Sequence, residues 1–257
     1  MTFKFVDLDV RGSVGWYRFN RPARNSVDWE MLYELAPAFE ALLEAAEVKV
    51  IVIASALDDY FSTGADISAF KDVAAERMQD WVRETQKVAQ VLRSSSKPVL
   101  AAINGVAVGG GLEMTFHADL RFLAIDARLG QPEVNIGFIP PVGGTQGLLR
   151  LVGRSQAFRM LYGGQVMEAK TAQEIGLADF VVPVDQLASE VQSYADMLAS
   201  KPANTLAAIR RCLVDGGGRA FDDGLEIERD QAFALAGHAN FAEGVTAFLE
   251  KRKPEWR

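Results

Sequence analysis

Two glutamates and a run of glycines are the residues of this sequence with the clearest chemical potential. The glycines at 109–111 precede a helical pattern that contains Glu113, and Glu133 follows twenty residues later. Glycine permits unusual backbone conformations and lets a ligand approach closely. The first N–H groups of a helix lack intrahelical partners and can donate to a developing oxyanion. Two carboxylates beside such a donor would suit general acid/base catalysis on a substrate with an activated carbonyl.

Each of these features also has a structural explanation. The glycines are equally compatible with a tight turn between a strand and a helix. Glu113 lies about one helical turn after Gly110, where an isolated glutamate is usually on the surface, and Glu133 alone is unremarkable in its loop. The residues taken one at a time leave the choice open. The dinucleotide-binding pattern G-x-G-x-x-G is absent, which argues against that kind of site.

A second glycine turn lies upstream, in the Ser-Thr-Gly-Ala-Asp sequence of residues 62–66. It could expose another N–H, and two N–H groups from separate turns can converge on one oxygen. The alternative is a plain loop in which Asp66 caps the next helix. We interpret His117 as structural, because no serine or cysteine nucleophile accompanies it, and Cys212 as a core residue of an amphipathic helix.

The elements that must position these residues alternate between strand and helix. Residues 3–10 and 14–20 alternate polar and apolar positions and predict a β-hairpin. Ser26 is predicted to cap a helix that runs through Ala46. The apolar, β-branched run at 49–55 predicts a strand buried on both faces. This order indicates an α/β protein.

The same patterns assign the rest of the chain. Further strands are predicted at 99–103, 106–108, 120–125, 128–129 and 180–183, and helices at 66–93, 110–116, 143–151, 154–162, 171–175 and 185–200. Beyond Pro202 the pattern is helical throughout, at 203–214, 221–237 and 241–251.

The composition and net charge of the chain exclude several classes of function. A chain of 257 residues with 49% apolar and 24% charged residues is typical of a folded globular protein. The net charge of −7 argues against a nucleic-acid surface. One cysteine excludes an intrachain disulfide, and the two histidines have no close carboxylate spacing that resembles a metal site. The chain shows neither a signal pattern nor an apolar run of ~18 residues, so we expect a cytoplasmic protein without a membrane span.

Taken together, these motifs resemble those of the enoyl-CoA hydratase/isomerase (crotonase) superfamily. They follow the family's order and spacing over nearly the whole chain. The matching segments are Asn20-Arg21-Pro22, Phe61–Ile67, Lys97-Pro98 through Asn104-Gly105, Gly109–Glu113, Gly130–Glu133, Gly137–Gln146, Ala172–Ala178 and Glu243–Lys253.

The resemblance implies a crotonase-like α/β fold, a spiral of β-β-α turns that occupies residues 1–200 and holds the active site. Residues 201–257 would form a C-terminal helical region used in trimer assembly, often as a dimer of trimers. The ligand would be an acyl-CoA thioester, with no cofactor apart from the CoA of the substrate.

The resemblance also assigns roles. The N–H groups of Ala65 and Gly110 match the family's oxyanion hole. Glu113 and Glu133 match the hydratase glutamates, which jointly hold and activate a water that adds to the β-carbon, while Glu133 supplies a proton to the α-carbon. Contacts to CoA would come from Ala23, Arg24, Ala65, Asp66, Ile67, Phe248 and Lys251. The last of these would reach the CoA of a neighbouring subunit.

Hydration of an enoyl-CoA is therefore the leading hypothesis. An enoyl-CoA isomerase, which can work with one carboxylate at Glu133, is an alternative that the retention of Glu113 disfavours. A hydrolase of an unusual cyclic acyl-CoA is another, since Trp81 and Pro141 leave the acyl group open. A non-catalytic CoA- or RNA-binding scaffold is a remote third. The sequence departs from the common family pattern at Pro140-Pro141-Val142, which is expected to reshape the acyl pocket, and at Phe116 and His117, which replace small residues.

Overall fold

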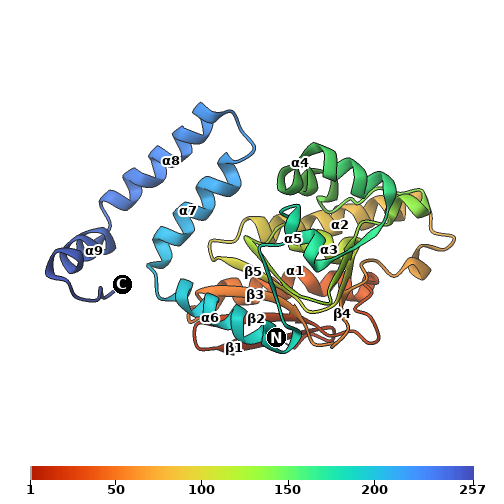
Figure 1. The fold of residues 1–257 in the computed structure, drawn as a ribbon, viewed down its shortest axis with the longest axis horizontal. Helices are drawn as coiled ribbons and strands as arrows, with labels where there is room; N and C mark the ends of the chain where they lie inside the picture. The colour runs from red at the N-terminus through yellow and green to blue at the C-terminus, as the bar shows by residue number, and fades with distance from the viewer. Residues whose placement is uncertain (1) are drawn as a thin grey trace.

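The computed structural model describes residues 2–257 and contains two sheets (Figure 1). The larger sheet has the order β1-β2-β3-β5-β7-β10, and the smaller has the order β4-β6-β8-β9. Only the β1–β2 and β8–β9 pairs are antiparallel. The strands are β1 (Val6–Arg11), β2 (Val14–Phe19), β3 (Val50–Ser55), β4 (Tyr60–Ser62), β5 (Val99–Ile103), β6 (Val106–Val108), β7 (Leu120–Ala124), β8 (Arg128–Gly130), β9 (Val166–Glu168) and β10 (Phe180–Val182).

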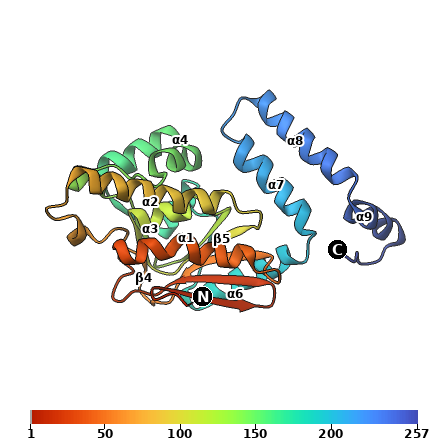
Figure 2. The same ribbon diagram turned by 180° about the vertical axis from the view of Figure 1, so that it is seen from behind.

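The helices pack on both faces of the larger sheet and then continue as a separate arm (Figures 1 and 2). They are α1 (Trp29–Glu44), α2 (Ala75–Arg93), α3 (Gly110–Thr115), α4 (Gly144–Gly163), α5 (Ala169–Glu174), α6 (Leu187–Ala199), α7 (Ala203–Gly216), α8 (Phe221–Ala236) and α9 (Ala239–Glu250). Three short 3₁₀ turns each lie between a strand and the next helix: η1 (Ile67–Phe70), η2 (Glu133–Ile136) and η3 (Val184–Gln186).

The buried central strands explain the continuous apolar runs of the sequence. In β3, Ile51 and Ile53 face the core that contains α1, whereas Val50 and Val52 face the core that contains α6. Side chains alternate along a strand, so a strand covered on both faces must be apolar at every position. The prediction for residues 49–55 is confirmed.

A repeated β-β-α turn builds the spiral. In each repeat a strand of the larger sheet is followed by a strand of the smaller sheet and then by a helix: β3-β4-α2, β5-β6-α3 and β7-β8-α4. Consecutive repeats therefore place equivalent strand-to-helix turns side by side, with β4 paired to β6 and β6 to β8. The expected α/β spiral is confirmed.

Several local predictions are wrong. The cap of α1 is Asp28, whose side chain accepts from the Met31 N–H, because the Ser26 hydroxyl instead bonds that of Thr63 at 2.7 Å. The single helix expected over 66–93 divides into η1 and α2, with Asp72 between them at a φ of 57°. The three-residue strands β4 and β9 have no counterpart among the predicted strands, because so short a segment carries little periodicity.

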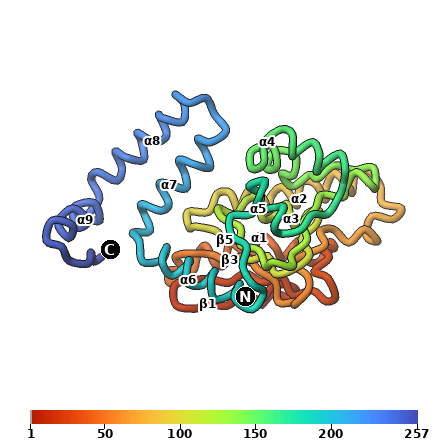
Figure 3. Tube along the Cα trace, viewed as in Figure 1, coloured from red at the N-terminus to blue at the C-terminus, as the bar shows by residue number. Residues whose placement is uncertain are grey.

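The helical arm formed by α7, α8 and α9 projects from the sheets in both views, and Figure 3 shows α7 and α8 running side by side. Buried Arg210 fastens α7 to the core, donating to the Asp119 carboxylate at 3.0 Å and to the Arg93 and Ser95 carbonyl oxygens at 2.7 and 2.6 Å. Cys212 is only partly buried because α7 packs little against the core, so its prediction as a core residue is wrong for the single chain.

Large apolar side chains are exposed along the arm, among them Leu213, Phe221, Phe233, Phe248 and Leu249, each at least 70% exposed. Apolar surface of this extent usually marks an interaction surface. Assembly through the arm stays a prediction. Within residues 2–257, none of the helices combines the length and apolar character needed to cross a bilayer.

Candidate active site

Glu113 is fully buried, although it is a glutamate on a short helix. Its Oε1 accepts two backbone hydrogen bonds, from the Val142 N–H at 2.6 Å and the Gly144 N–H at 2.8 Å. Its Oε2 has no hydrogen-bond partner among the described residues, and the side chain lines a cavity. Because a buried polar atom without a partner is costly, this oxygen is suited to a ligand or water in the cavity.

The protonation of Glu113 follows from this position. Burial raises its pKa to about 8, and the nearby charge of Glu133 acts in the same direction. The two N–H groups at Oε1 favour the charged form but do not outweigh burial. Burial also raises the pKa of Glu133. Both carboxyls therefore bind a proton more readily than an ordinary glutamate, and they titrate as a coupled pair.

Glu133 opens η2 and is partly exposed to the same cavity. Its Oε1 lies 3.0 Å from the place that a Cβ would occupy on Gly109, so the glycine leaves room for the carboxylate. Buried Gln131 places its side-chain amide 3.0 Å from both Glu133 carboxylate oxygens, with its nitrogen as the donor. Both sequence-predicted glutamates are thus brought to one cavity.

The two glycine turns also meet. A Cβ on Gly64 would lie 2.7 Å from the Gly110 backbone nitrogen, and Gly64 has a φ of 73°. Val27 donates to the Gly64 carbonyl oxygen at 2.7 Å and accepts from the Asp66 N–H at 2.7 Å. The Gly64 carbonyl and the Ala65 N–H belong to one trans peptide group and point in opposite directions. Because the carbonyl faces Val27, the Ala65 N–H points away from it.

The N–H groups of Ala65 and Gly110 are consequently free donors. Neither donates a backbone hydrogen bond within residues 2–257, and the first N–H of α3 has no intrahelical acceptor. Both residues line the cavity that contains the two glutamates. The structure therefore brings together all four residues that the sequence singled out for chemistry.

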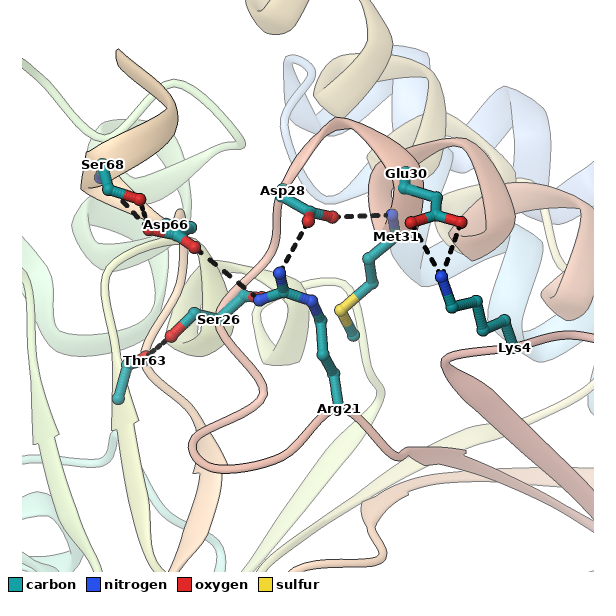
Figure 4. Close-up of polar contacts among 9 residues, drawn as sticks. All are labelled: Lys4, Arg21, Ser26, Asp28, Glu30, Met31, Thr63, Asp66 and Ser68. Carbon is teal, nitrogen blue, oxygen red and sulfur yellow. Dashed lines mark hydrogen bonds and ion pairs between the residues drawn. The ribbon is translucent and has the colours of Figure 1, made fainter. Parts of the chain in front are cut away.

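A polar network supports the Gly64 turn from the N-terminal side (Figure 4). The Arg21 guanidinium donates to the Ser26 carbonyl oxygen at 2.6 Å and to the Asp28 carboxylate at 2.6 Å, and it lies 3.7 Å from the Asp66 carboxylate. Fully buried Asn25 donates to the Phe61 carbonyl oxygen at 2.9 Å. These contacts fix the loop that carries Val27 against the turn that carries Ala65.

The cavity has a volume of about 260 Å³ and runs from the glutamates to the space between α1 and α2. Its inner wall is formed by apolar side chains, namely Leu32, Leu35, Trp81, Val88 and Met114. Thr85 also lies there, but its hydroxyl donates to the carbonyl oxygens of Trp81 and Val82 at 3.0 Å. Among the described lining residues, Glu113 and Glu133 are the only charged ones. The inner end suits a hydrocarbon.

The residues predicted to contact CoA fall into two groups. Ala23, Arg24, Asp66 and Ile67 lie on adjacent loops beside Ala65, since the Thr63 N–H donates to the Arg24 carbonyl oxygen at 3.1 Å. The Asp66 carboxylate already caps η1 by accepting from the Ser68 N–H at 3.1 Å. The Asp66 N–H is also taken, by the Val27 carbonyl oxygen, so a contact between Asp66 and CoA stays a prediction.

Phe248 and Lys251 form the second group and lie on or just after α9, in the arm away from the sheets (Figure 1). Phe248 is 83% exposed. A single chain does not bring them to the cavity, in keeping with the expectation that Lys251 serves a neighbouring subunit, which stays a prediction.

Sequence reasoning missed the residues that hold the site together. Val142 and Gly144 hold Glu113 through backbone groups, which leave no signal in side-chain chemistry. Gln131 belongs to a recognised motif and Asn25 lies just after another, but their roles as buried donors appear only in three dimensions. Among residues 2–257, no group of His, Cys, Asp or Glu is arranged to hold a metal ion.

A β-β-α spiral with two carboxyls and two free backbone donors in one cavity defines a crotonase-fold protein, and comparison with known proteins agrees. The sequence model of enoyl-CoA hydratase/isomerase matches residues 9–257. The chain is 35% identical over 255 residues to the crotonyl-CoA hydratase of Syntrophomonas wolfei, which covers 98% of each chain.

Two further relatives extend the comparison. The chain is 36% identical over 249 residues to the 2,3-dehydroadipyl-CoA hydratase of Escherichia coli, covering 93% of this chain and 92% of the relative. The solved enoyl-CoA hydratase of Bacillus anthracis has a TM-score of 0.94 at 30% identity, covering 98% of this chain and 99% of that one. The chain belongs to the enoyl-CoA hydratase/isomerase family.

Proposed function

We propose that this protein is an enoyl-CoA hydratase that adds water across the α,β double bond of an acyl-CoA thioester. The observation that carries the proposal is the Glu113 carboxylate, with one oxygen held by two backbone donors and the other free in a cavity shared with Glu133. Family membership and relatives named as hydratases support it.

The Ala65 and Gly110 N–H groups receive the thioester carbonyl oxygen. As water adds, the electron pair of the double bond moves toward this oxygen, which develops enolate charge. Rigid donors stabilise that charge without reorganising at the moment of reaction, and each contributes on the order of 3 kcal/mol in comparable sites. Gly64 permits the close approach of the two turns that makes both donors available.

The two glutamates act on the water and the proton. Glu113 and Glu133 hold the water between them. Glu113 Oε2 accepts a proton from the water, while the water oxygen bonds the β-carbon. Glu133 delivers its proton to the α-carbon. The pair holds one proton before and after the step. The proton ends on Glu113, where the raised pKa favours it, and it passes to Glu133 before the next turnover. The elevated pKa values of both carboxyls suit this shared proton. The reaction needs no cofactor beyond the CoA of the substrate.

The acyl group occupies the apolar inner end of the cavity. Trp81, Thr85 and Val88 are spaced at i, i+4 and i+7 on α2, so this wall extends about 10 Å along the helix. An uncharged hydrocarbon chain fits such a wall, whereas an acyl group that ends in a carboxylate would bury an unpaired charge there.

The CoA portion lies over the loops of Arg24 and Asp66. A neighbouring subunit of a trimer, or of a dimer of trimers, contributes Phe248 and Lys251 through its arm. The exposed apolar surface of the arm supports this assembly. A cytoplasmic location is also part of the proposal.

The test follows the loss of absorbance of crotonyl-CoA and of longer enoyl-CoA substrates. Wild-type protein should hydrate them, and Glu113→Gln and Glu133→Gln should each lower kcat by about two to four orders of magnitude. A wild type inactive on every enoyl-CoA would refute the hydratase function. Hydration that survives in both variants would refute the assigned roles. A shift of the double bond without hydration would instead identify an isomerase.

A further inference from the structure

The backbone N–H and carbonyl oxygen of Val142 both form hydrogen bonds with side chains of one short segment. The Val142 N–H donates to Glu113 Oε1 at 2.6 Å, and the Val142 carbonyl oxygen lies 2.6 Å from His117 Nε2. Glu113 and His117 are four residues apart: Glu113 lies within α3, and His117 lies two residues beyond its end. Two side chains of this segment therefore hydrogen-bond to one residue of the loop before α4.

The direction of the histidine bond is set by its partner. A carbonyl oxygen can only accept, so His117 Nε2 carries the hydrogen and donates it. The pKa of His117 is lowered to about 4, mainly by burial; the hydrogen bond to Val142 opposes this shift and the charge of Arg93 adds to it. The ring is therefore neutral near pH 7 and held in a single tautomer.

The ring also packs against the next residue of the loop. A Cβ on Gly143 would lie 2.9 Å from His117 Cε1, and Gly143 has a φ of 104°. Gly144 follows and supplies the second N–H to Glu113 Oε1 at 2.8 Å. His117 thus contacts the loop at the two positions that precede the second donor to Glu113.

We propose that His117 is a positioning residue that fixes the Glu113 carboxylate, with one oxygen held by the loop and the other free to face the substrate. By holding the Val142 carbonyl oxygen, it keeps the Val142 and Gly144 N–H groups directed at Oε1. With Oε1 occupied by these two donors, Oε2 is the oxygen left for water. His117 itself touches neither substrate nor water. The inference rests on the proposed function, since it assigns a consequence for the hydration step.

The test compares His117→Leu, which removes the donor at similar volume, with His117→Gln, whose amide can still donate to the Val142 carbonyl oxygen. We expect His117→Leu to lower kcat for crotonyl-CoA about tenfold or more with little change in KM, because a small misplacement of a catalytic group is costly. His117→Gln should recover most of this loss.

The pH profile of kcat distinguishes a loss of Glu113 positioning from a general loss of packing around the site. The charged and titratable groups around Glu113 and His117 are Glu133, which faces Glu113, and Arg93, which lies near the His117 ring. The two N–H groups at Oε1 lower the pKa of Glu113, so their loss raises it. The alkaline limb of the kcat profile should therefore move to higher pH in His117→Leu and return in His117→Gln.

Thr115→Val is the matched control. Thr115 is fully buried at the end of α3, and its hydroxyl donates to the Leu112 carbonyl oxygen at 2.7 Å and not to the loop. It should leave the pH profile in place. Should His117→Leu fail to fold, His117→Asn replaces it, because asparagine is too short to reach the Val142 carbonyl oxygen.

The outcomes distinguish this inference from the proposed function. If Glu113→Gln abolishes hydration while His117→Leu (or His117→Asn) keeps wild-type kcat, the positioning role is overturned and the hydratase stands. A loss that Thr115→Val reproduces, with an unmoved pH profile, also overturns it. If wild type hydrates no enoyl-CoA, the proposed function itself fails. If Glu113→Gln leaves hydration intact, the catalytic role of Glu113 fails, and with it the positioning role of His117.

Discussion

Gly64 and Gly110 approach so closely that a side-chain carbon on Gly64 would lie 2.7 Å from the Gly110 nitrogen. The contact joins two turns that are far apart in the sequence and equivalent in the β-β-α repeat. Because its obstacle is a backbone atom, the added carbon could be accommodated only if one turn moved. The pairing of the Ala65 and Gly110 donors therefore depends on the absence of a side chain at residue 64.

Gly64→Ala should accordingly separate the two donors. We expect kcat for crotonyl-CoA to fall by about a hundredfold or more, because loss of one oxyanion donor has an effect of that size. Gly12→Ala is the matched control, since Gly12 also has a positive φ, of 62°, but open space around its Cβ position. It should lose stability from backbone strain and retain kcat. Equal kcat losses in the two variants would contradict the explanation.

The shared proton of Glu113 and Glu133 predicts an alkaline decline in activity. Hydration needs one protonated and one charged carboxyl, and the pKa of Glu113 is raised to about 8. Above that pH Glu113 releases its proton, so the pair loses a proton that hydration needs. The kcat profile for crotonyl-CoA should therefore fall on an alkaline limb near pH 8. A profile flat through pH 10 would contradict the shared proton.

The same raised pKa predicts that folding stability falls as pH rises. Between the ordinary pKa of 4.5 and about 8, the folded state binds the Glu113 proton and the unfolded state releases it. Wild type therefore loses stability across this window, by at most about 1.4 kcal/mol per pH unit, and the loss is complete above pH 8. Glu113→Gln, which keeps an acceptor for both N–H groups, lacks this loss.

Urea unfolding of wild type and Glu113→Gln at about pH 5 and about pH 8.5 measures the effect. The stability advantage of the variant should be larger at the higher pH. An advantage that stays constant or shrinks would show that Glu113 is charged in the folded protein throughout this range.

The apolar inner cavity predicts a preference among acyl groups. Octenoyl-CoA should be hydrated with a kcat/KM at least equal to that of crotonyl-CoA, because Trp81 and Val88 provide further apolar contact. Dehydroadipyl-CoA, the substrate named for the 36% identical relative, should be worse than octenoyl-CoA by more than about a hundredfold, because its terminal carboxylate would be desolvated without a partner. Comparable values for these two substrates would show that the chain end reaches solvent instead.

Much of the fold could be predicted from the sequence because it rests on local patterns. The apolar run at 49–55 and the glycines at 109–111 have the same meaning wherever they fold, and the expected strand and strand-to-helix turn are both present. The motifs around Glu113 and Glu133 likewise indicated the family, which the comparisons show. Ser26 was mistaken for a helix cap because only the folded chain brings the competing Thr63 hydroxyl within 2.7 Å.

The state of the site was decided by tertiary structure alone. Whether Glu113 has a free oxygen depends on Val142 and Gly144, which lie 29 and 31 residues further along the chain. Whether the Ala65 N–H is free depends on two hydrogen bonds to Val27. Residue types determined which chemistry was available to this protein, because carboxyls and glycines carry it in their covalent structure. Hydrogen-bond partners depend on the register in which distant backbone segments meet, and only the folded chain sets that register.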